Sequence, residues 1–176
     1  MKQTRKGNWI QTWSGIQFWP LDPRPEDIQI LDIAHALGKL CRYNGHTQKF
    51  YSVAEHSVYV SRRVPKEFTM WGLLHDAAEA YISDIPGPIK KMLPDVKIME
   101  GKIMAAIVEK FGLIPSTEPP EVKQIDNDIL NDEAMQLMGR PFPKWEMLNG
   151  NQLGIHIAGW LPGQAITNFI GRFHEL

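Results

Sequence analysis

The residues best suited to chemistry are the adjacent pair His75-Asp76, which stands in an otherwise apolar stretch of predicted helix. A neutral imidazole and a carboxylate are common ligands of divalent cations. Neighbouring residues on a helix point about 100° apart, so both can reach one ion only if it lies off one edge of the helix. Other helices must then supply further ligands, and an antiparallel preceding helix would bring His56 opposite His75. A plainer interpretation makes the histidine a hydrogen-bonded core residue.

A later helix, predicted over residues 121–138, carries the next candidate ligand. Its apolar positions form one stripe at 100° spacing, made of Val122, Ile125, Ile129, Leu130 and Leu137. Asp126 falls inside this stripe, whereas Asp128 and Asp132 are predicted to face solvent on the opposite side. A buried carboxylate is costly unless it is paired or binds a metal, so Asp126 is the candidate ligand, with Glu133 second. A buried ion pair with an arginine or a lysine would explain Asp126 equally well.

Two further carboxylates follow the His-Asp pair closely enough to act on a water molecule. Glu79 comes four residues after His75 and therefore projects from the same helix face, and Asp84 begins the loop that follows. A metal-dependent hydrolase needs a carboxylate that orients or deprotonates the attacking water, and either residue could do so. Each also has an ordinary interpretation, Glu79 as an exposed helix residue and Asp84 as a turn former. Cations that could bind a phosphate are present at Arg42, Lys90, Lys91 and Lys123.

The properties of the whole chain limit the class of protein. A length of 176 residues suits one domain spanning 1–176, and a net charge of −1 gives no general attraction to nucleic acid or to an anionic membrane. The single cysteine, Cys41, excludes an internal disulfide and suits a reducing compartment. No stretch resembles a secretory signal or reaches the roughly 18 apolar residues of a membrane span. We therefore expect a cytoplasmic protein, located in the host cytoplasm if its source is a phage.

Apolar periodicity and helix breakers predict an all-α helical bundle with an extended N-terminal arm. Pro20, Pro23 and Pro25 forbid regular helix in the arm, where Ile16–Trp19 could form one strand of a small hairpin. The segment Ser52–Glu55 has the sequence of a capping box, in which the serine accepts an amide proton and the glutamate reaches back. Helices are predicted over residues 26–40, 52–64, 66–82, 89–93, 96–111, 121–138 and 165–173.

Taken together, the candidate ligands resemble the H…HD…D pattern of the HD-domain phosphohydrolase superfamily, here His56, His75-Asp76 and Asp126. The match extends to strings that look like those of bacterial 5′-deoxynucleotidases and of the small phage dATP triphosphohydrolases. These strings are Ala54–Ser57, His75–Glu79, Asp84–Lys90 and Lys123–Asp126. The resemblance covers roughly residues 27–138. It implies an HD-domain bundle of five or more helices and a homo-oligomer, either a dimer or a hexamer.

The resemblance also implies the cofactor and the catalytic residues. One divalent transition metal would be held by His56, His75, Asp76 and Asp126. This ligand set suits Zn, Co or Mn, and Mg, Fe or Ni are also compatible. Glu79 would position the attacking water, and Asp84 would assist it.

Substrate-binding residues follow from the same resemblance. Arg42-Tyr43 looks like an Arg-Trp pair of the family, in which the arginine contacts the substrate phosphate and the aromatic ring favours deoxyribose. Tyrosine in place of tryptophan is a departure that bears on how strictly a deoxy sugar is selected. Lys90 and Lys123 correspond to phosphate-binding lysines of the phage triphosphohydrolases.

The expected reaction is metal-dependent hydrolysis of a 2′-deoxynucleotide, and two substrates remain open. One is dATP or another dNTP, cleaved to deoxynucleoside and triphosphate, which the two lysines favour because a longer phosphate tail needs more cations. The other is a dNMP, cleaved to deoxynucleoside and phosphate. A catalytically silent nucleotide-binding module is the alternative from another class, and a cyclic-nucleotide or alarmone phosphodiesterase would use the same chemistry. The expected partner is a small-molecule nucleotide, with no nucleic acid and no membrane.

Overall fold

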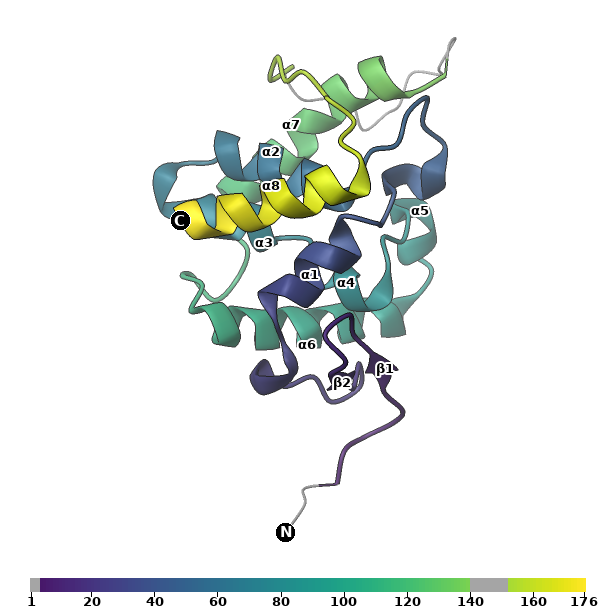
Figure 1. Ribbon diagram of the computed structural model, residues 1–176, viewed down its shortest axis with the longest axis vertical. Coiled ribbons are helices and arrows are strands. Elements are labelled where there is room, and N and C mark those ends of the chain that lie inside the picture. Colours follow the sequence, from purple (N-terminus) through teal and green to yellow (C-terminus); the bar gives the residue numbers. More distant parts are fainter. Residues whose placement is uncertain (1–3, 140–151) are drawn as a thin grey trace.

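The computed structural model describes residues 4–139 and 152–176, and this part of the chain is mainly α-helical, as predicted. The elements are β1 (Ile10–Gln11), β2 (Gln17–Phe18), η1 (Pro25–Asp27), α1 (Ile30–Leu37), η2 (Arg42–Gly45), α2 (Val53–Arg63), η3 (Lys66–Phe68), α3 (Thr69–Leu74), α4 (Glu79–Ile82), α5 (Gly87–Lys90), α6 (Pro94–Phe111), α7 (Pro120–Leu137) and α8 (Pro162–Glu175). Figure 1 shows α8 lying across the body of the molecule, with α7 towards one end and the β1–β2 hairpin towards the other.

Helix α2 is the most deeply buried element that carries a site residue. Every residue from Val53 to Ser61 is buried, and α2 packs against α3, α7 and α8. Ser52 caps the helix by accepting the amide N–H of Glu55, an interaction worth about 1 kcal/mol. The second half of the predicted capping box is wrong, because the Glu55 carboxylate instead accepts the backbone N–H groups of Gly159 and Trp160. Glu55 therefore ties α2 to the segment that leads into α8.

The single helix predicted over residues 66–82 is in fact three short pieces, η3, α3 and α4. Residues 75–78 form turns, and the amide of Glu79 donates to the carbonyl of Asp76 rather than to a residue one full α-turn back. Sequence pattern missed the interruption because apolar residues continue through it at helical spacing. At this break the side chains of His75 and Asp76 meet, with 3.2 Å between Nε2 and Oδ2.

Gly72 allows α3 to lie close against α2. A Cβ at this position would be 2.9 Å from the Cα of Ser61, which is closer than packed atoms tolerate. We expect Gly72→Ala to lower the free energy of unfolding by about 1–3 kcal/mol in urea denaturation. Gly101→Ala on α6 is the matched control, because a Cβ there meets nothing within 4 Å. This variant should raise the free energy of unfolding by up to about 1 kcal/mol. Equal free energies of unfolding for Gly72→Ala and the unmodified protein would contradict the close packing of α3 on α2.

The N-terminal arm forms the small hairpin that the sequence predicted. Strands β1 and β2 pair antiparallel, with Ile10 opposite Phe18. Phe18 is completely buried, and its ring stacks on Tyr81 with 3.9 Å between ring centroids. The arm is therefore packed against α4, the helix that begins with Glu79.

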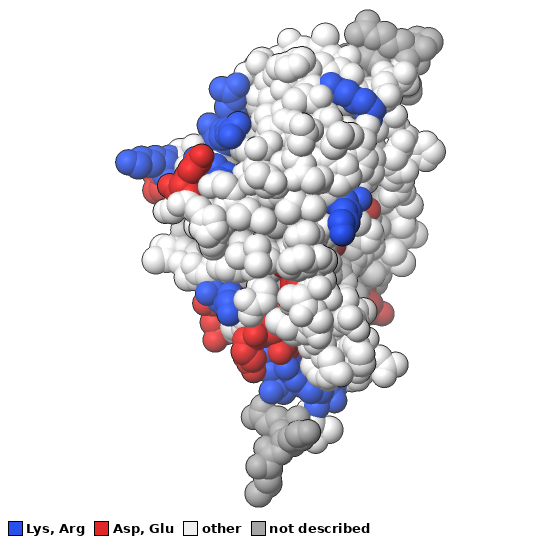
Figure 2. Space-filling view, in the orientation of Figure 1, with Lys and Arg blue, Asp and Glu red and all other residues white. Residues whose placement is uncertain are grey.

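The face of the molecule seen in Figure 2 has a largely uncharged centre, with acidic and basic side chains near its edges. This mixed distribution agrees with a net charge of −1 for the whole chain. Within the described ranges, no helix combines the length and the apolar character needed to cross a bilayer.

Candidate metal centre

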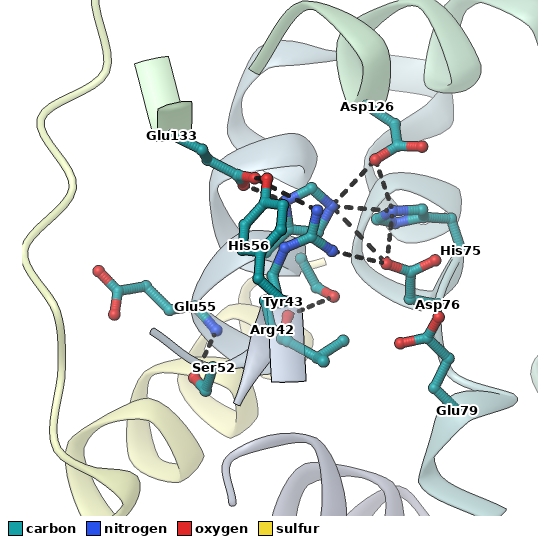
Figure 3. A network of polar contacts seen from close by, with 12 residues as sticks. Arg42, Tyr43, Ser52, Glu55, His56, His75, Asp76, Glu79, Asp126 and Glu133 are labelled. Atoms are coloured by element: carbon teal, nitrogen blue, oxygen red, sulfur yellow. Dashed lines mark hydrogen bonds and ion pairs between the residues drawn. The ribbon is translucent and has the colours of Figure 1, made fainter. Parts of the chain in front are cut away.

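The four predicted metal ligands meet between α2, the α3–α4 break and α7 (Figure 3). His56 Nε2 lies 3.3 Å from His75 Nε2 and 3.1 Å from Asp126 Oδ1. His75 Nε2 is 3.7 Å from Asp126 Oδ1, and Asp76 Oδ2 is 3.7 Å from His56 Nε2. One donor atom from each of His56, His75 and Asp126 falls within a span of 4.8 Å, so this cluster could hold a metal ion.

Hydrogen bonds at the far side of each imidazole, on Nδ1, direct the Nε2 atoms of His56 and His75 towards the cluster. His56 Nδ1 lies 2.7 Å from Glu133 Oε1, and His75 Nδ1 lies 2.9 Å from the carbonyl oxygen of Gly72. Both partners are acceptors, so the ring proton of each neutral histidine is on Nδ1. In that neutral state the two Nε2 lone pairs would face one another across 3.3 Å, beside two carboxylates. A divalent metal ion fits such a donor set.

The carboxylates of the cluster remain ionised in spite of their burial. Burial raises the pKa of Asp126, but hydrogen bonds from His56 and His75 overcome this and hold the pKa well below its usual range. Burial also raises the pKa of Asp76, and the charge of His75 outweighs it, so this pKa is low as well. For His75, burial lowers the pKa, but Asp76 and Asp126 more than offset this, and the pKa is raised. A metal ion bound at Nε2 would displace the proton that these carboxylates favour. Ionised carboxylates are the form that binds a metal.

Similarity to known proteins places the chain in a family. No family model matches it. Over 171 residues it is 42% identical to uncharacterized protein YfdR of Escherichia coli, across 96% of both chains. The chain belongs to the same family as YfdR. An uncharacterized protein of Rhodobacter capsulatus is 35% identical over 189 residues, across 97% of this chain and 96% of its own. Since both relatives are uncharacterized, the activity of this YfdR-family chain must be argued from its site.

The predicted substrate-binding pair enters the site from η2. Arg42 is buried, and its guanidinium lies 3.5 Å from Asp76 Oδ2 and 3.3 Å from Glu133 Oε2. The hydroxyl of Tyr43 donates to the same Glu133 oxygen. Tyr43 has a backbone φ of 57°, in the left-handed region that few residues other than glycine adopt. Strained backbone of this kind collects at functional sites.

Glu79 is buried, so its interpretation as an exposed helix residue is wrong. Its side chain points towards the cluster beside Asp76 (Figure 3), and Oε1 lies 3.7 Å from Lys90 Nζ. Oε2 has no hydrogen-bond partner within residues 4–139 and 152–176. Burial raises the pKa of Glu79, and the charges of Asp76 and Asp84 raise it further. A buried carboxyl group with a raised pKa in such a place is typical of one that exchanges protons during catalysis.

Asp84 lies half-buried in the loop after α4. Burial raises its pKa, against the opposing charge of Arg42. The structure thus places Asp84 within electrostatic reach of the predicted phosphate-binding arginine and of Asp76.

Both predicted phosphate-binding lysines reach the edge of the cluster, and each is paired with a carboxylate. Lys90 Nζ lies 2.7 Å from Glu100 Oε1, and Lys123 Nζ lies 2.7 Å from Asp126 Oδ2. The Lys123 side chain is 56% exposed, so a ligand in solvent can reach its ammonium group. Lys91, the remaining cation of the sequence pattern, is exposed.

Helical phase identified Asp126 correctly but misplaced two other acids of α7. Asp128 and Asp132 were predicted to face solvent, and both are buried. The segment before α8 covers that side of the helix, where the amide of Leu153 donates to Asp132. The prediction for Asp128 and Asp132 was wrong because a single stripe at 100° spacing gives α7 only one buried face.

The sequence pattern gave Glu133 no defined role in the site. It was ranked second among the acids of its helix, and it is completely buried against His56 and Tyr51. A sequence signal for it exists, because seven residues after Asp126 is two helical turns and therefore nearly the same face. No pattern in the sequence indicates the contribution of Tyr51.

Proposed function

We propose that this protein is a metal-dependent phosphohydrolase of the HD-domain superfamily that acts on a 2′-deoxynucleotide. The observation that supports this most directly is the meeting of two Nε2 atoms, from His56 and His75, beside the carboxylates of Asp76 and Asp126. A divalent transition metal bound there, such as Zn, Co or Mn, would polarise a phosphoryl oxygen and help to generate hydroxide from water.

The side chains around the cluster would carry out the remaining steps. Glu79 would accept the proton of the attacking water, since its Oε2 is buried and has no partner within the described ranges. Arg42 would bind a phosphate oxygen and offset the negative charge that develops in the transition state. Asp84 would adjust the orientation of Arg42 and of the water through its charge.

The cations favour a triphosphate as the phosphate group of the substrate. Arg42, Lys90 and Lys123 come from three elements, η2, α5 and α7, and Lys123 contacts the metal ligand Asp126 directly. A triphosphate tail carries more charge than a monophosphate and uses more of these groups. We therefore propose dATP or another dNTP as substrate, cleaved to deoxynucleoside and triphosphate, with a dNMP as the alternative.

Product identification separates these functions. The metal-loaded protein would be incubated with dATP and with dAMP in parallel, and the products would be resolved by anion-exchange chromatography. Inorganic triphosphate and deoxyadenosine from dATP are the expected result. Release of phosphate from dAMP, with no cleavage of dATP, would favour the 5′-deoxynucleotidase. A nucleotide that stabilises the folded protein but is not hydrolysed with any divalent metal tested would favour a catalytically silent binding module. A chelator-treated sample should lose its activity and regain it when metal is restored.

A further inference from the structure

Glu133 lies where donors from three separate parts of the chain converge on one carboxylate. Its Oε1 accepts from His56 Nδ1 at 2.7 Å and from the hydroxyl of Tyr51 at 2.8 Å. Its Oε2 accepts from Arg42 Nη2 at 3.3 Å and from the hydroxyl of Tyr43. The side chain is completely buried, so these groups provide its solvation in place of water.

We infer that Glu133 is a positioning residue that links the metal centre to the phosphate-binding arginine, with one carboxylate oxygen serving each. The role assigned to Arg42 rests on the proposed function. The role towards His56 rests on the metal centre alone. Neither role requires Glu133 to touch the metal or the substrate.

The Oε1 side fixes the ring of His56. A carboxylate that accepts from Nδ1 holds the imidazole in the tautomer whose Nε2 lone pair faces the cluster. Tyr51 holds the same oxygen in place from a completely buried position. Carboxylates in this relation to a ligating histidine typically contribute a factor of about 10–100 in metal affinity.

The Oε2 side fixes Arg42. The guanidinium is buried, with Nη2 on Glu133 and Nη1 3.5 Å from Asp76. Without the Glu133 charge, this cation would be drawn fully onto Asp76 and would compete with the metal for that carboxylate. The hydroxyl of Tyr43 on the same oxygen also supports the left-handed backbone that follows Arg42. Both contacts orient Arg42 towards the metal side of the site.

Glu133→Gln tests the inference because an amide cannot serve both sides. With its oxygen towards His56, its NH₂ group faces Arg42, which can only donate. With its oxygen towards Arg42, its NH₂ group faces Nδ1 of His56 and favours the tautomer that places the proton on Nε2. We expect Zn(II) affinity, measured by competition with a chromophoric chelator, to fall about 10–100-fold. The nucleotide KM at saturating metal should also rise about tenfold, because Arg42 loses its orientation.

Asp132→Asn is the matched control. Asp132 is the neighbouring residue on α7, is also buried and accepts a backbone N–H from Leu153, outside the site. We expect this variant to lose thermal stability and to keep its Zn(II) affinity within about twofold. A Zn(II) affinity of Glu133→Gln equal to that of Asp132→Asn would overturn the inference.

A measurement on the unmodified protein covers the case in which Glu133→Gln fails to fold. In the Zn(II)-loaded protein labelled with ¹⁵N at histidine, His56 Nδ1 should carry a slowly exchanging, downfield proton. An unprotonated Nδ1 at His56 would overturn the inference. Neither this spectrum nor the metal titration depends on turnover. Zn(II) binding with the expected spectrum, but without nucleotide hydrolysis, would support the role of Glu133 towards His56 and contradict the proposed function.

Discussion

Replacing His75 by alanine is expected to lower hydrolytic activity by about three orders of magnitude or more, since a bound metal supplies several kcal/mol of transition-state stabilisation. The substitution removes one of the two Nε2 atoms that stand 3.3 Å apart at the centre of the cluster. It leaves Asp76 and Asp126 with one imidazole partner in place of two. Metal affinity should therefore fall together with activity.

The fold should survive this change. His75 lies at the break between α3 and α4, so no regular helix depends on its backbone conformation. The far-UV circular dichroism spectrum should match that of the unmodified protein. His35→Ala on α1, where the ring stacks on Trp13 away from the cluster, is the control and should keep both metal binding and activity. Zn(II) binding and turnover close to normal in His75→Ala would contradict the assignment of His75 as a ligand.

Replacing Glu79 by glutamine is expected to reduce kcat by about 10²–10⁴-fold while leaving metal affinity almost unchanged, because loss of a general base has this size of effect. The amide keeps the shape of the side chain but cannot accept the proton of the attacking water. Stability should stay equal or rise. The raised pKa of Glu79 means that folding disfavours its ionised form relative to the unfolded chain, and an amide removes that cost.

Glu79→Gln removes both the proposed general base and a charge beside Lys90 Nζ, so its control must remove only a charge beside Lys90. Glu100 holds the same ammonium group at 2.7 Å and comes from α6. We expect Glu100→Gln to change kcat by no more than about threefold, because a partly exposed ion pair contributes little. A kcat for Glu79→Gln as high as that for Glu100→Gln would show that Glu79 does not act on the water. Thermal unfolding of both variants provides the test of stability.

The sequence predicted which side chains form the cluster better than it predicted the backbone that presents them. Asp126 could be selected because the cost of burying a carboxylate on an apolar stripe is a local property of one helix. The interruption at residues 75–78 could not be predicted, since apolar spacing does not indicate where main-chain hydrogen bonds change partner. On a straight helix, the pair His75-Asp76 could share a metal only if the ion lay off one edge. The observed break removes that restriction.

The positions of the side chains around the cluster depend on contacts between residues far apart in the sequence, so the sequence pattern could not predict them. Glu133 lies 77 positions from His56, and their contact follows from how α7 packs on α2. Tyr43 was predicted to contact the sugar of a substrate, but no pattern could indicate that its hydroxyl is bound to Glu133. The burial of Asp132 likewise depends on a segment that follows it along the chain.

Anomalous diffraction from crystals grown with excess Zn(II) would show whether His56, His75, Asp76 and Asp126 hold a metal ion. We expect a strong anomalous peak between His56 Nε2 and His75 Nε2, within coordination distance of Asp76 and Asp126, and no such peak in crystals of His75→Ala. Crystals in which these four side chains adopt the arrangement of Figure 3 but show no anomalous peak among them would contradict the metal centre.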